Sequence, residues 1–229
     1  MHDAPIVICG RGHSGTRLMA QILIDNEYDL GYSKNVQLDS TNWSMLIIPL
    51  YNEKNFSKFS EEAKKLERSE KWGWKLGETI FVFEEILRLY PDVKFLNMVR
   101  DGRDVIISKV WDQFYTTQKM MHQHDTIVDI SYFWQQKLWA ESWIKHVELG
   151  LILELKYPEN FKNISYEKLC IQPKVLEKQI SLFVKNNIKI TTPPIKNRIK
   201  KWKDEKRKEY LNSFKLMDNL LRKLYVTNL

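Results

Sequence analysis

The hydrophobic pattern of the chain begins with a short apolar run that ends at a group of glycines. Residues 6–9 are all apolar, which indicates a buried strand. Gly10, Gly12 and Gly15 come next, and they interrupt the apolar pattern. Apolar residues then recur at helical spacing from Leu18. The pattern predicts a strand, a glycine-rich loop and a helix in succession.

The middle of the chain repeats this order. Residues 72–76 begin a second unit, and apolar positions between residues 80 and 89 predict a helix that ends before Pro91. Residues 93–99 predict another strand, which runs through a polar turn into an apolar helical stretch from Val105.

Two stretches have weaker periodicity. Residues 25–70 are polar and mixed, and their best-formed element is a charged helix expected near residues 57–70, with Ser57 or Ser60 as its cap. Residues 111–129 are polar and aromatic, and we expect them to be irregular.

The C-terminal half adds one more strand between helices. Helices are predicted from about residue 131, through residues 176–183 and through residues 216–224, and residues 163–166 predict a strand. Because strands alternate with helices, the predicted fold class is α/β, with a central parallel sheet flanked by helices.

Length and composition favour one domain. The 229 residues, 43% of them hydrophobic, fit a single domain over residues 1–229. Cys9 and Cys170 are too few for a disulfide framework, and no run approaches the ~20 apolar residues of a membrane span. We expect no signal peptide before the first strand. We therefore expect a cytoplasmic protein without a membrane span.

The net charge of +7 is concentrated near the C-terminus. Residues 196–208 contain eight basic and two acidic residues. Such a segment is typical of binding to nucleic acid, to an anionic membrane or to an anionic small ligand, and also of a solvated helix face with no partner. The sequence lacks the ligand spacing of a zinc finger and the basic region followed by heptads that some DNA-binding proteins have. Neither motif therefore supports the nucleic-acid interpretation.

The loop at residues 10–17 has the character of a phosphate-binding loop. Small residues let the backbone wrap an anion, and the N-terminus of the following helix supplies a positive field. The loop of ATP-binding proteins continues with Lys and Ser or Thr after its second glycine, but Thr16 and Arg17 stand at those positions here. The sequence therefore disfavours magnesium-dependent binding of ATP.

A second polar loop follows the strand at residues 93–99. Arg100 offers a fork of donors at the strand end, and Ser108 offers a hydroxyl two turns further. Asp101 and Asp104 stand at N-cap and N3 spacing, which predicts a helix start between them. The alternative is that Arg100 pairs with one of these carboxylates and binds no ligand.

Together the two loops resemble those of the sulfotransferases that use 3′-phosphoadenosine 5′-phosphosulfate (PAPS). Residues 13–16 match the 5′-phosphosulfate loop of that family, and residues 100–108 match its 3′-phosphate motif. Residues 165–169 are similar to its Tyr-Glu-Asp-Leu segment, and residues 198–202 to its C-terminal cofactor-closing segment. The four segments come in the order that the family has and span most of the chain.

The resemblance implies a P-loop-like three-layer fold and in-line, metal-independent sulfuryl transfer from PAPS to a hydroxyl or an amine of a carbohydrate or small-molecule acceptor. It places the 5′-phosphosulfate at Arg11, Gly12, His13, Ser14, Gly15, Thr16 and Arg17. It places the 3′-phosphate at Arg100 and Ser108, with Arg198, Lys201 and Trp202 near the cofactor. On this interpretation the basic segment at residues 196–208 binds the anionic nucleotide, so its charge does not imply a nucleic-acid partner.

Two positions depart from the family pattern. His13 stands where many relatives have Lys or Arg, so its charge near neutral pH depends on its surroundings, and Arg11 is an alternative source of positive charge. Lys200 stands where relatives commonly have glycine, which predicts a closing loop of different shape. A folded but inactive sulfotransferase therefore stays an alternative.

The resemblance places the general base at or just after the strand that precedes the 3′-phosphate unit, here within residues 74–79. Glu78 is the candidate base there, with a first-turn glutamate of a helix as the alternative. Lys75 corresponds to a family lysine near the sulfate, with a solvated lysine as the alternative. We expect surface roles for His122 and His124.

Tryptophans supply further candidates. Trp139 and Trp143 are four residues apart on a predicted helix and are expected in the core. Trp43 and Trp111 lie outside strong periodicity, so we expect them in an acceptor cleft.

Two other functions stay open. A P-loop kinase requires magnesium-dependent ATP binding, which Thr16 and Arg17 oppose. A nucleic-acid-binding protein using residues 196–208 predicts steeply salt-dependent binding.

Overall fold

The computed structural model describes residues 4–31, 38–68, 70–108, 132–191, 199–200, 203, 215 and 217–218. The predicted C-terminal helix lies almost entirely outside these ranges, as do residues 111–129. Among the described residues, no helix combines the length and the apolar character needed to cross a bilayer.

A parallel sheet forms the centre of the fold. Its strands are β1 (Ile6–Gly10), β2 (Gly73–Lys75), β3 (Lys94–Val99) and β4 (Phe161–Ser165), in the spatial order β2-β1-β3-β4. All three pairings are parallel. Both faces of β1 are buried, which explains its uninterrupted apolar sequence.

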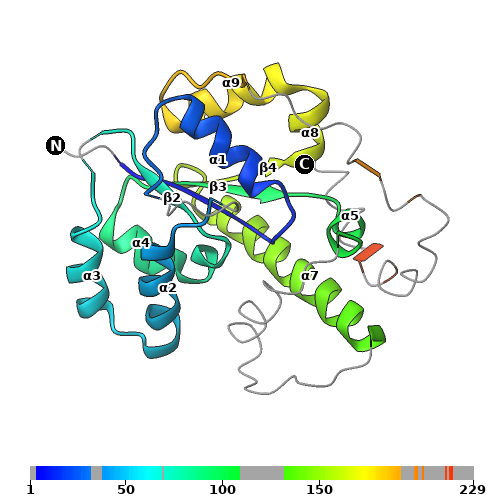
Figure 1. Ribbon diagram of the computed structural model, residues 1–229, viewed down its shortest axis with the longest axis horizontal. Coiled ribbons are helices and arrows are strands. Elements are labelled where there is room, and N and C mark those ends of the chain that lie inside the picture. The colour runs from blue at the N-terminus through cyan, green and yellow to red at the C-terminus, as the bar shows by residue number, and fades with distance from the viewer. Residues whose placement is uncertain are drawn as a thin grey trace.

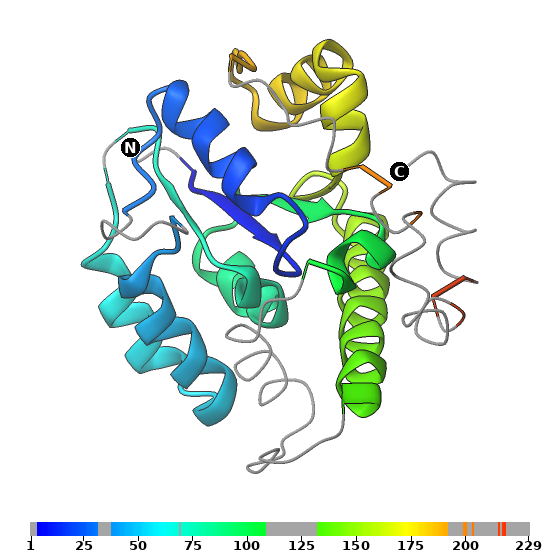
Figure 2. The same cartoon turned by 45° about the vertical axis from the view of Figure 1, so that its right-hand side comes forward.

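Helices cover both faces of the sheet (Figures 1 and 2). One face carries α1 (Thr16–Asp25), α8 (Tyr166–Ile171) and α9 (Pro173–Val184). The other face carries α2 (Thr41–Glu53), α3 (Phe56–Lys64), the 3₁₀ helix η1 (Gly77–Val82), α4 (Phe83–Leu89) and α7 (Tyr132–Lys156). The short α5 (Gly102–Ile106) follows β3 and packs on α7.

The strand side chains explain this division into layers. Ile6 and Ile8 of β1 pack with α1, α8 and α9, while Val7 and Cys9 pack with the helices of the opposite face. This alternation is the period-two geometry of a strand. The predicted α/β fold with a parallel sheet between two helical layers is confirmed.

Several boundaries differ from the prediction. The helix expected near residues 57–70 is α3, and neither predicted serine caps it: the Asn55 side chain accepts a hydrogen bond from the N–H of Lys58 at 3.1 Å. The single helix expected before Pro91 is two elements, η1 and α4. The helix after Asp101 ends at Ile106, so Ser108 lies in the turn beyond it.

The expectation that Trp43 lies in an acceptor cleft is wrong. Trp43 is 2% exposed, and its ring stacks on that of Trp74 with centroids 3.7 Å apart. Trp72 lies against both rings. These large apolar surfaces fill the space between β2 and α2, so Trp43 is a core residue. Trp139 and Trp143 are buried as predicted.

Candidate active site

The first loop joins β1 to α1 and requires its glycines. Gly15 has φ 95°, and a Cβ there would lie 2.4 Å from the ring of Tyr166. Gly10 has φ 142°, and a Cβ there would lie 2.7 Å from the carbonyl oxygen of Met98. His13 is also left-handed, with φ 68°. The loop is therefore wound tightly against β3 and α8, with the N-terminus of α1 at its end.

Two buried polar atoms of this loop have no hydrogen-bond partner among the described residues. They are Nε of Arg11 and Oγ of Ser14, whose side chains belong to residues 8% and 1% exposed. Burial lowers the pKa of Arg11 to about 10, an effect that nearby Glu78 opposes. Native proteins rarely leave buried donors unpaired. Donors of this kind in a glycine-rich loop fit an anionic group such as a phosphosulfate.

Arg100 connects the two loops. Its Nη1 donates to the carbonyl oxygen of His13 at 3.0 Å, and its guanidinium lies 4.8 Å from the centre of the Tyr166 ring. Its Nη2 is 3.7 Å from Asp104. The sequence placed these residues in separate motifs, and the structure brings them together.

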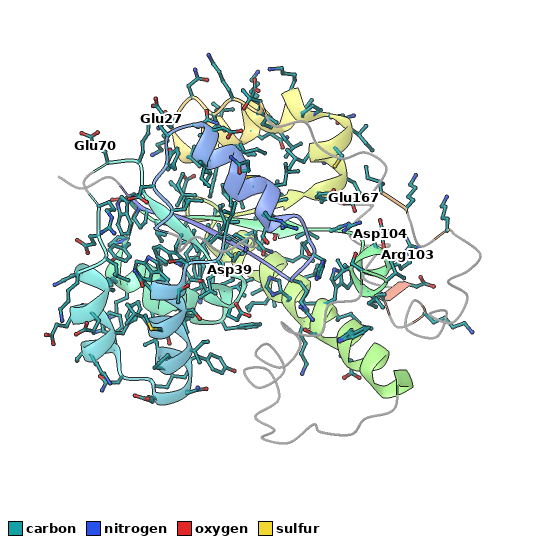
Figure 3. The ribbon with its side chains drawn as sticks, viewed as in Figure 1. Glu27, Asp39, Glu70, Arg103, Asp104 and Glu167 are labelled. Carbon is teal, nitrogen blue, oxygen red and sulfur yellow. The ribbon has the colours of Figure 1, made fainter. Side chains whose placement is uncertain are left out.

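The remaining acidic residues of the second loop support its shape. Asp101 caps α5 and forms an ion pair of 2.6 Å with Arg103. The backbone N–H of Asp101 donates to the carboxylate of Glu167 at 2.9 Å. Figure 3 shows Arg103 and Asp104 on α5, with Glu167 close by. Burial raises the pKa of Glu167, while the N–H of Asp101 opposes that shift.

Ser108 is half-buried, and its Oγ donates to the carbonyl oxygen of Asp104 at 2.7 Å. A hydroxyl in this bond keeps its lone pairs and must turn before it can donate to a phosphate. No pattern in the sequence indicates this internal bond.

The closing segment reaches the second loop at Lys200. The N–H of Lys200 donates to the Asp104 carboxylate at 2.7 Å, and its φ is 59°. Lys200 therefore takes the left-handed conformation for which glycine is favoured. Arg198, Lys201 and Trp202 lie outside the described residues, as do Trp111, His122 and His124.

A pocket opens between the first loop, β2 and η1. Its lining residues are Gly10, Arg11, Gly12, Thr16, Asp39, Lys75, Gly77, Glu78, Phe81 and His146. Lys75 is 3% exposed and pairs with Asp39, so it is not the solvated lysine of the alternative. Glu78 is half-buried at the start of η1. Arg17 is exposed and does not line this pocket.

Sequence reasoning missed His146, which lies in the middle of α7. Burial and the charge of Arg11 lower its pKa to about 3, so the ring is neutral at physiological pH. A lone histidine among apolar helical positions gave no signal, because only folding brings α7 beneath the first loop.

The fold and the two loops define an α/β protein with a loop suited to a phosphate-like anion beside a polar pocket. Comparison with known proteins identifies the family: the sulfotransferase domain family matches residues 3–219. The chain belongs to the PAPS-dependent sulfotransferase family and is a transferase.

Solved structures agree in fold. The chain is similar to sulfotransferase STF9 from Mycobacterium avium, with 14% identity, 99% of this chain and 77% of that chain covered, and a TM-score of 0.57. It is also similar to the sulfotransferase domain of the Synechococcus PCC 7002 olefin synthase, with 15% identity, 96% of both chains covered and a TM-score of 0.53. No curated protein sequence matches significantly.

Proposed function

We propose that this protein transfers a sulfuryl group from PAPS to a hydroxyl or an amine of a small-molecule or carbohydrate acceptor. The observation that carries the proposal is the pair of buried, unpartnered polar atoms in the first loop, Arg11 Nε and Ser14 Oγ. PAPS supplies, when bound, an activated sulfuryl group and two separate phosphates. That charge distribution suits two loops joined by one arginine.

On this proposal the chain divides the donor between its loops. Ser14 and Thr16 donate their hydroxyls to the 5′-phosphosulfate, and Arg11 contributes the positive charge that His13 lacks when neutral. Arg100 and Ser108 hold the 3′-phosphate. Arg198, Lys201 and Trp202 stay predicted cofactor contacts, and no metal is required.

Glu78 and Lys75 act on the acceptor side. Both line the pocket next to the first loop. Glu78 receives the proton of the attacking hydroxyl, and Lys75 stabilises negative charge on the transferred group. Asp39 pairs with Lys75 and so keeps this buried cation in place until the anionic group arrives.

The test is a calorimetric titration with 3′-phosphoadenosine 5′-phosphate (PAP), ADP, and ATP with magnesium. Selective binding of PAP, unchanged by magnesium, is the expected result. A preference for ATP with magnesium would make the protein a kinase and overturn the proposal. Oligonucleotide binding that falls steeply with salt would instead favour the nucleic-acid function of residues 196–208.

Variants separate the donor site from the general base. Thr16→Ala should weaken PAP binding about tenfold, because one charge-assisted hydrogen bond is lost. Lys174→Ala is the control, since Lys174 is 81% exposed and does not line the pocket. Glu78→Gln should slow turnover and leave PAP affinity unchanged. Full turnover in Glu78→Gln would remove Glu78 as the base.

A further inference from the structure

A line of polar side chains crosses the apolar layer between the sheet and α7. His146, Asn97 and Asn163 are each at most 3% exposed. The Nε2 of His146 lies 3.2 Å from Oδ1 of Asn97, and Nδ2 of Asn97 donates to Oδ1 of Asn163 at 2.8 Å. The line begins at the pocket, because the His146 ring is part of the pocket lining.

The direction of every hydrogen bond in this line is fixed by its far end. The carbonyl oxygen of Gly150 can only accept, and it receives Nδ2 of Asn163 at 2.9 Å. Oδ1 of Asn163 must then face Asn97 and accept from its Nδ2. Oδ1 of Asn97 consequently faces His146, so Nε2 of that ring carries the proton. Cys9 Sγ donates to the same oxygen at 3.5 Å.

The helix is adapted to this arrangement at Gly150. A Cβ at that position would lie 2.5 Å from Nδ2 of Asn97 and 2.8 Å from Oδ1 of Asn163. Glycine weakens a helix interior, and α7 carries one where the two amides approach. The line ends at Glu154, which accepts from Asn163 at 2.7 Å and pairs with Lys162 at 2.7 Å.

The surroundings of the ring in the pocket are charged on several sides. Arg11 comes from the first loop, Lys75 from β2, Glu78 from η1 and Asp39 from the segment before α2. The nearby thiol of Cys9 has its pKa raised by burial. A neutral ring with its proton on Nε2 has one remaining lone pair, on Nδ1.

We propose that His146 is an uncharged hydrogen-bond acceptor of the acceptor site, and that Asn97 and Asn163 are the positioning residues that fix its tautomer. Its Nδ1 accepts a hydrogen bond from the acceptor, either from the second hydrogen of an attacking amine or water or from a hydroxyl next to the attacking one. The attacking group is thereby oriented beside Glu78, which takes its proton. This inference rests on the proposed sulfuryl transfer. It adds a residue that touches the acceptor and two residues that act through it.

The tautomer is tested on the free protein, without any substrate. Nitrogen NMR of ¹⁵N-histidine-labelled protein should show His146 with a protonated Nε2 and an unprotonated Nδ1, unchanged between about pH 5 and 8. Gly150→Ala and Asn97→Leu should abolish this single state, whereas Ile152→Ala, on the exposed side of α7, should preserve it. A charged ring, or a proton on Nδ1, in the unmodified protein would overturn the proposal.

The role in transfer is tested with water as the acceptor, by following release of radiolabelled sulfate from PAPS. His146→Phe keeps a ring packed on Phe81, whose ring is now 5.8 Å away. It should release sulfate about tenfold more slowly, the effect of one lost hydrogen bond, with unchanged PAP affinity. Release at the unmodified rate in a folded His146→Phe protein would overturn the proposal.

Asn97→Asp gives a readout that a purely structural role would not produce. A carboxylate opposite the ring raises the pKa of His146 and converts it to a cation as the pH falls. The rate of sulfate release should then decrease on the acid side, in a way that the unmodified protein and Ile152→Ala do not share. If the unmodified protein fails to bind PAP, the proposed function fails, while the NMR result still decides the tautomer.

Discussion

The two loops that follow β1 and β3 differ in how far their buried polar groups are engaged within the protein. The first loop leaves Arg11 Nε and Ser14 Oγ without partners among the described residues. In the second, Asp101 pairs with Arg103, and Asp104 accepts the N–H of Lys200. The first loop therefore keeps binding capacity for a ligand, whereas the second uses much of its capacity to hold the protein together.

The largest effect of this difference is expected at Asp104. It is fully buried between Arg100 and the N–H of Lys200. Asp104→Ala should lower the free energy of unfolding by about 3 kcal/mol, because it leaves a buried guanidinium without its carboxylate. Urea denaturation measures this loss. Glu84→Ala, which breaks an exposed pair with Lys156, is the control and should cost little. Equal losses would contradict the contrast between the loops.

The next effect concerns the shape of the first loop. Gly15→Ala combines a left-handed backbone with a Cβ that meets Tyr166, so we expect a loss of about 2 kcal/mol and weaker PAP binding. Gly31→Ala is the matched control, because Gly31 has φ 54° but no atom within 4 Å of the added Cβ. Thermal unfolding of both variants separates the contact from the backbone strain.

Arg11→Met tests whether the buried donor of the first loop is kept for ligand binding or for stability. Removing an unpartnered buried donor should leave the free energy of unfolding unchanged or raise it, while PAP affinity falls about tenfold. Calorimetry and urea denaturation on the same sample measure both. A loss of stability as large as that of Asp104→Ala would show that Arg11 belongs to the scaffold.

The smallest effect is a pH dependence at Glu167. Its pKa is raised by burial, so the folded protein binds this proton more tightly than the unfolded chain. The resulting loss of folding stability is absent below the usual glutamate pKa. It grows as the pH rises toward the pKa that Glu167 has in the folded protein. Glu167→Gln should remove this slope, because a glutamine side chain does not titrate. The free energy of unfolding is measured against pH for both proteins. If Glu167→Gln keeps the slope of the unmodified protein, a group other than Glu167 causes it.

Strands and the first loop could be predicted because their signals are local. Residues 6–9 are apolar on both faces, and the glycines that follow are required by the backbone. In contrast, the sequence did not predict α2. Its apolar residues are spread around the helix and so show no helical periodicity, and Pro49, a residue that disfavours helix interiors, lies within it.

The pocket beside the first loop was only partly predictable because its residues are distant in sequence. Lys75 and Glu78 were predicted, while Asp39 and His146 became visible only in the folded chain. Asn97 and Asn163 interrupt strands that were recognised from their apolar neighbours, so their polarity drew no attention.

The buried position of both cysteines has a practical consequence. Cys9 and Cys170 lie in the core on opposite faces of the sheet, with no disulfide. A thiol reagent should therefore leave the native protein unlabelled and react as each layer opens. Because the two sites report different layers, the order in which they are labelled would reveal whether the layers separate together or one after the other.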